Sequence, residues 1–97
     1  MSYQVFVDDN FHYMDQEHRY FLGEFDTVEA AVVACQKVVN ECLEEFYKPG
    51  ITAAELSTQY VFFGEDPFIL GGGSGEVLFS ARAYASDQVE KIANRPK

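Results

Sequence analysis

Residues 26–46, DTVEAAVVACQKVVNECLEEF, decide the fold of this chain. Asp26, followed three residues later by Glu29, has the form of a capping box, in which two side chains bind backbone N–H groups at the start of a helix. The apolar residues that follow recur at helical spacing and form one broad face, with charged residues opposite. The pattern predicts a long amphipathic helix ending at residues 48–50, because proline disfavours helical geometry in the preceding residue. The predicted apolar face comprises Val28, Ala31, Val32, Cys35, Val38, Val39, Cys42, Leu43 and Phe46.

Two segments before this helix have strand composition. Residues 3–7 alternate, with Tyr3, Val5 and Val7 on one face, and residues 19–25 have the same aromatic character. Between them, polar residues 14–18 are where we expect the chain to reverse, so the first quarter predicts a β-hairpin. Residues 8–10 interrupt the alternation and predict a bulge or break there.

The chain after the long helix contains two further helix starts. Thr52 and Glu55 form a second capping box, and Ser80 can cap a final helix that runs to about Ala93. Between these helices, residues 59–63 combine helical spacing with strand composition. We expect about two turns of helix followed by a short strand there. Residues 64–67 then predict a turn, and residues 68–70 a short buried segment.

This order of elements predicts an α+β fold in a single domain of residues 1–97. A small antiparallel sheet, made of the N-terminal hairpin plus one or two short strands, packs against a long central helix and a C-terminal helix. The chain has 97 residues, 47% hydrophobic and 15% aromatic, which is enough apolar material for one core without disulfides.

The two cysteines and the start of the chain indicate a cellular compartment. Cys35 and Cys42 lie about 10 Å apart along one helix, beyond the ~7 Å limit for a disulfide, so we expect reduced thiols that pack as small hydrophobes. The chain does not begin with a basic and apolar leader, and no stretch approaches the ~20 apolar residues of a membrane span. We therefore expect a cytoplasmic protein with no membrane segment.

The net charge of −9 limits the classes of partner. Residues 1–66 hold thirteen acids against three basic residues, a net −10, whereas residues 67–97 hold three acids against four basic residues, a net +1. Direct binding to nucleic acid is not expected, because its affinity comes mainly from Lys and Arg. An acidic surface suits a basic protein surface or a small ligand as partner, and the motifs predict no cofactor. An acidic mimic of nucleic acid is a further alternative.

Two acidic pairs lie inside phenylalanine frames: residues 6–11, FVDDNF, and residues 63–68, FGEDPF. Our leading hypothesis is a non-enzymatic binding or adaptor module with an acidic, aromatic surface, on the condition that the fold brings the two segments together. The alternative is a small metal-dependent or acid–base enzyme that uses the same carboxylates. Paired acids at turns also serve as caps and Asx-turns, and a transition metal would need a carboxylate with two imidazoles. The expected binding residues are Asp8, Asp9, His12, Tyr13, Glu65 and Asp66, and the expected metal ligands are His12, His18 and Asp15.

Four segments in this order resemble a known group of proteins: residues 6–15 (FVDDNFHYMD), 23–27 (GEFDT), 47–50 (YKPG) and 63–68 (FGEDPF). Over nearly its whole length the chain is similar to a family of short, uncharacterised bacterial proteins. The resemblance implies a bacterial, cytoplasmic single domain, and it implies no activity, ligand or partner.

Overall fold

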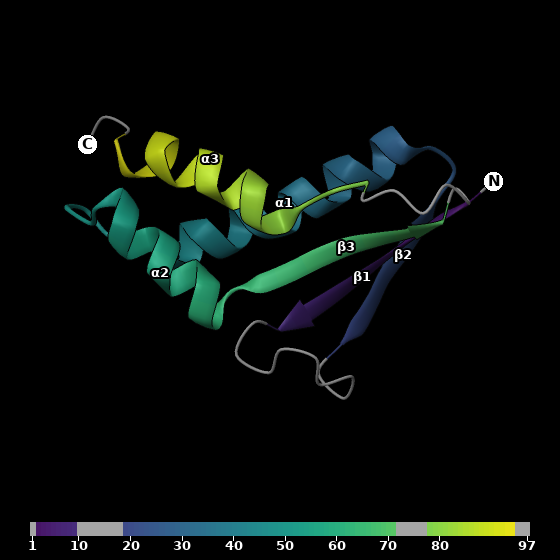
Figure 1. Cartoon of the computed structure of the whole chain (residues 1–97), viewed down its shortest axis with the longest axis horizontal. Helices are drawn as coiled ribbons and strands as arrows, with labels where there is room; N and C mark the ends of the chain where they lie inside the picture. Colours follow the sequence, from purple (N-terminus) through teal and green to yellow (C-terminus); the bar gives the residue numbers. More distant parts are fainter. Residues whose placement is uncertain (1, 10–18, 72–77, 95–97) are drawn as a thin grey trace.

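The described strands and helices follow one another in the order that the sequence predicts. The computed structural model describes residues 2–9, 19–71 and 78–94. Within these residues the order of elements confirms the predicted α+β class (Figure 1). The elements are β1 (Tyr3–Asp9), β2 (Tyr20–Phe25), α1 (Val28–Phe46), α2 (Ala53–Phe63), β3 (Glu65–Gly71) and α3 (Ala81–Ala93).

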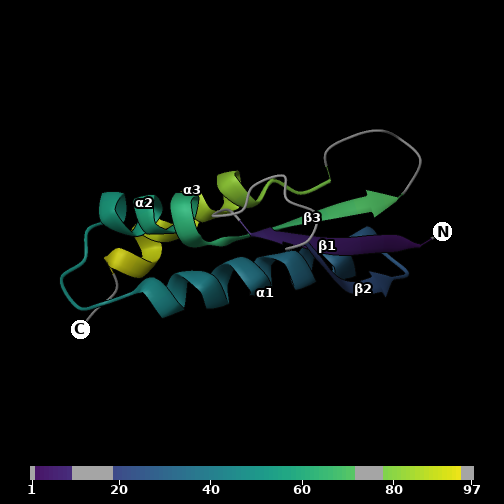
Figure 2. The same ribbon diagram turned by 90° about the horizontal axis from the view of Figure 1, so that it is seen from below.

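The three described strands form one antiparallel sheet in the order β2-β1-β3. Figure 2 shows α1 on one side of this sheet. Val5 and Val7 are fully buried, and Val5 packs against Ala31 and Cys35 of α1. Because successive side chains of a strand point to opposite faces, Val5 and Val7 define an inner face that α1 covers. Gln4, Phe6 and Asp8 point to the opposite face, which we call the outer face.

Helix α1 is shared by two hydrophobic clusters. Its first half contributes Ala31 and Cys35 to the cluster under the sheet. Its second half contributes Val39 and Leu43 to a larger cluster that also holds residues of α2 and α3. Accordingly, α1 runs beneath both the sheet and the α2–α3 pair in a molecule 44 Å long and 19 Å thick (Figure 2). The predicted apolar face of α1 therefore supports the whole fold.

The helix starts agree with the sequence except at α1. Thr27 caps this helix, its Oγ1 accepting a hydrogen bond from the Ala30 N–H at 3.2 Å, so the prediction of Asp26 as the capping residue is wrong by one position. Helix α2 has the predicted capping box of Thr52 and Glu55, and Ser80 caps α3. Local side-chain oxygens thus fix where each helix begins.

Both cysteines are free and buried, which confirms that they pack as small hydrophobes. Burial raises the pKa of the Cys35 thiol and of the Cys42 thiol to about 11. Both thiols are therefore protonated at neutral pH and are poor nucleophiles.

The junction between α2 and β3 differs from the prediction. Residues 59–63 are helical, and the predicted turn at 64–67 is replaced by Gly64 alone, because β3 begins at Glu65. Helix α2 continues through residues 59–63 because Leu56 and Tyr60, one turn apart, are both buried in the larger cluster. The Tyr60 hydroxyl then donates a 2.7 Å hydrogen bond to the carbonyl oxygen of Glu65. Tertiary burial overrides strand composition at this point.

The predicted bulge is also displaced. Strand β1 continues through Asp8 and Asp9, so neither residue breaks the strand. Instead, the register with β2 shifts between Val5 and Phe6, which leaves Leu22 as the extra residue on β2. The irregularity lies in the edge strand, where fewer hydrogen bonds depend on it.

We expect Gly64→Ala to lower the free energy of unfolding by about 2 kcal/mol. A Cβ at this position would lie 2.6 Å from the Tyr60 carbonyl oxygen and 2.6 Å from its ring, so backbone would have to move. Gly23→Ala is the control, because its Cβ would only meet the Phe25 ring at an ordinary 3.5 Å. Urea denaturation of both variants checks this, and equal losses would contradict the expected clash.

Candidate functional site

The two phenylalanine-framed segments lie side by side as paired strands. In the β1–β3 register, Phe6 is opposite Phe68, Asp8 is opposite Asp66, and Asp9 is opposite Glu65. The condition for a joint surface, that the fold brings these segments together, is therefore met. Both acidic pairs lie in strands instead of turns.

The alternation of side chains divides the four acids between two faces. Asp8 and Asp66 share the outer face, whereas Asp9 and Glu65 share the inner face. On the inner face the Tyr20 hydroxyl donates a 2.9 Å hydrogen bond to Glu65 Oε2. Burial and this contact raise the pKa of Tyr20 to about 12. The four carboxylates consequently do not converge on one surface.

Three phenylalanines from three strands pack together on the outer face, with Phe68 stacked on Phe6 and Phe21 tilted against it. The Phe6 ring lies between its cross-strand neighbours, 5.3 Å from the Phe21 ring centroid and 5.9 Å from that of Phe68. Phe21 remains 53% exposed, and Leu70 on the same face is 49% exposed. We call these four residues the outer-face patch. Contiguous exposed apolar side chains of this kind mark interaction sites.

Arg19 joins the acidic and aromatic parts of this face. Its Nε donates to Asp8 Oδ1 at 2.6 Å and its Nη2 donates to Asp8 Oδ2 at 3.1 Å, a bidentate ion pair. The same guanidinium lies 4.9 Å from the centroid of the Phe68 ring. The hydrogen bond to Asp8 raises the pKa of Arg19, so the guanidinium stays charged. Sequence reasoning missed this residue, although it is the only Lys or Arg before Lys37 and directly precedes a strand.

Asp66 is the acid of this face whose pKa is raised. Burial, and after it the charge of Asp8 across the strands, raises the pKa of Asp66, and the charge of Arg82 on α3 opposes this rise. Among the described residues, Asp8 has Arg19 as a counter-ion at hydrogen-bonding distance, whereas for Asp66 the charge of Arg82 only opposes the rise in pKa. The two carboxylates therefore differ: one is ion-paired, and the pKa of the other is raised.

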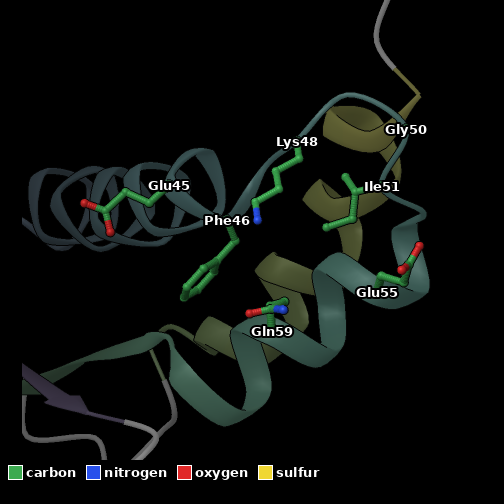
Figure 3. A pocket seen from close by; sticks show the side chains of 7 residues that line it. All are labelled: Glu45, Phe46, Lys48, Gly50, Ile51, Glu55 and Gln59. Atoms are coloured by element: carbon green, nitrogen blue, oxygen red, sulfur yellow. The ribbon is translucent and has the colours of Figure 1, made fainter.

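A groove of about 580 Å³ lies elsewhere, where α1 ends and α2 begins. In Figure 3, the side chains of Phe46 and Lys48 extend from the end of α1 toward α2, and Gln59 lies across from them. Glu45 and Glu55 flank this space. None of the predicted site residues that the structure describes lines this groove, and no residue of the outer-face patch does so either.

Four predicted site residues, His12, Tyr13, Asp15 and His18, lie outside the described residues. Within the described ranges, no group of three or more His, Cys, Asp or Glu side chains is placed to hold a metal ion. No helix in those ranges is both long and apolar enough to cross a membrane.

Comparisons with known proteins give no match: no protein-family model fits the chain, and no curated protein or solved structure is significantly similar to it.

We expect Asp66→Asn to stabilise the protein by about 0.5–1 kcal/mol at pH 7, because it removes a charge that lies opposite Asp8. A raised pKa means that the folded state binds this proton more tightly than the unfolded state. The cost of ionising Asp66 is therefore absent below about pH 4 and grows as pH rises through the folded pKa.

Urea denaturation of wild type and Asp66→Asn at both pH values checks the sign. Asp87→Asn is the control, since Asp87 is an exposed acid paired with Lys91. A gain that is as large at about pH 4 as at pH 7 would show that the charge is not its source.

We expect Arg19→Met to lower Tm clearly, because it leaves the nearly buried Asp8 carboxylate without its counter-ion. Asp8→Asn should also lower Tm, and the double variant should lose less than the sum of the two single losses. Lys91→Met, which breaks an exposed i,i+4 pair with Asp87, should change Tm very little. Thermal melts of the four variants measure this coupling, and strictly additive losses would rule out a coupled pair.

Proposed function

We propose that this chain is a non-enzymatic binding module that holds an apolar segment of a basic protein partner on its outer-face patch. The observation that carries the proposal is the stack of Phe6, Phe21 and Phe68 on the sheet face opposite α1, with Phe21 more than half exposed. A folded domain gains little from leaving such rings in water, whereas a partner that covers them gains their burial.

The patch has the organisation of a binding hot spot. Phe6 and Phe68 are held by stacking and by the Arg19 guanidinium, so their side chains lose little freedom when a partner binds. Polar residues of the same face, among them Gln4 and Asp66, lie around the rings. Interfaces commonly combine a buried aromatic centre with a polar rim.

The charge of this face favours a basic partner. Arg19 neutralises Asp8, which leaves Asp66 and, opposite Gln4 on β2, Glu24 as acids at the rim. A Lys or Arg beside the apolar segment would meet this charge, and nucleic-acid phosphates would be repelled. The nucleic-acid mimic receives less support, because Asp8 is buried in an ion pair and the four acids divide between two faces.

One observation favours the acid–base alternative. Asp66 has a raised pKa and is half-buried on the outer face, as a general acid can be. However, both oxygens of its neighbour Asp8 accept hydrogen bonds from Arg19, so Asp8 is not free to act as the companion base. Binding is the better supported function.

We expect a short peptide that combines Lys or Arg with Leu or Phe to bind with a Kd of about 10–100 µM, and Phe21→Ala to weaken it at least tenfold. Phe62→Ala is the matched control, since Phe62 is a similarly exposed phenylalanine on α2, at 59%. Calorimetric titration with a basic peptide, and with an acidic peptide of the same apolar residues, measures both effects. Equal affinity for the two peptides, or equal losses in the two variants, would contradict the proposal.

A further inference from the structure

Strand β2 forms an edge of the sheet that exposes apolar side chains. In the part of the chain that the structure describes, β2 pairs with β1 and with no other strand. Three consecutive residues are exposed: Tyr20 at 44%, Phe21 at 53% and Leu22 at 39%. Soluble proteins normally protect such an edge with charges or proline, because unpaired N–H and C=O groups attract another strand.

The other edge strand has that protection. Strand β3 begins with Glu65, Asp66 and Pro67, two charges and a residue without an N–H group. Phe79, just before α3, packs against the cluster that includes Ile69 of β3. The chain leading into α3 accordingly runs along the β3 side of the sheet (Figure 1). The two edges thus differ, and β2 is the one open to pairing.

An apolar groove continues the β2 edge onto α1. Its volume is about 330 Å³, and Leu22 and Phe25 of β2 line it together with Ala34 and Val38 of α1. Val33, one residue before Ala34, is 63% exposed. A strand placed beside β2 would therefore find both unpaired backbone and an apolar surface for its inward side chains.

The groove beside this edge carries one charge of each sign, although the whole chain carries −9. Lys37 and Glu41, one turn apart on α1, both border it. A two-fold axis beside β2 reverses the order of these two residues in the second copy, so that Lys37 of one chain faces Glu41 of the other. A basic peptide gains little from a groove without net charge, whereas a second copy of the chain is complementary to it.

We propose that two copies of this chain pair through β2 about a two-fold axis and form a continuous six-stranded antiparallel sheet. Leu22 of each copy enters the apolar groove region, and the outer-face patches of the two copies become neighbours. The bulge at Leu22 shortens the regular ladder, so the dimer is weak, with a Kd of about 1–100 µM. The test of this dimer is independent of the proposed function, because it measures the mass of the particle and not the binding of a ligand.

Sedimentation velocity of the full chain from about 1 µM to 1 mM tests the dimer. We expect wild type to reach twice the mass of one chain within this range. Leu22→Lys, which puts a charge into the groove, is expected to remain monomeric. Lys37→Glu, at an exposed side chain, is expected to raise the dimer Kd at least tenfold, and the swap Lys37→Glu with Glu41→Lys to restore it to within about threefold.

Lys91→Glu is the matched control, since Lys91 forms the same type of exposed i,i+4 pair on α3 and the net charge changes equally. It is expected to leave the dimer Kd unchanged. Circular dichroism checks whether each variant is folded. If Leu22→Lys does not fold, Lys37→Glu, at an exposed side chain, still tests the dimer. A wild-type chain that stays monomeric at about 1 mM overturns the proposal, as does a dimer that Lys37→Glu leaves intact.

Discussion

The antiparallel pairing of β1 with β3 is the constraint on which the rest of this structure depends. It joins residues 56 to 68 positions apart in the sequence, and its register places Phe6 against Phe68 and Asp8 against Asp66. Because side chains alternate, a slip of one residue would turn the Val5–Val7 face away from α1 and would turn Phe6 and Asp8 toward it. The hydrophobic requirement of the inner face therefore also decides which acids and rings lie together on the outer face.

Helix α1 is the layer that this pairing needs beneath it. The apolar inner face of the sheet has to be covered by another layer, and the two clusters on α1 join the sheet to the α2–α3 pair. Cys35 packs in the cluster under the sheet, and Val39, one turn later, packs in the cluster with α2 and α3. A single amphipathic helix thus packs against both halves of the fold and holds them together.

Local signals in the sequence predicted most elements, and non-local contacts account for the errors. Helix caps and apolar periodicity gave the order of strands and helices, since both act within a few residues. The short strand expected after two turns of helix within residues 59–63 is wrong, because the composition of this segment does not reveal that Tyr60 packs in a cluster with α1 and α3. The phenylalanine-framed acids were expected to act together as turns. Once they are strands, alternation alone separates Asp8 from Asp9. Arg19 was missed because its importance comes from Asp8 and Phe68, which the sequence does not place beside it.

The direct passage from α2 to β3 through Gly64 has a consequence for how this sequence can vary in length. The link between α1 and α2 spans several residues, so it can absorb an added residue without moving either helix far. Gly64 is the only residue between α2 and β3, so this junction cannot accommodate an added residue in the same way. An added residue would either break the contact between the Tyr60 hydroxyl and the Glu65 carbonyl or shift β3 along β1 by one position. Insertions and deletions in related chains should accordingly be found in the α1–α2 link and be excluded from this junction.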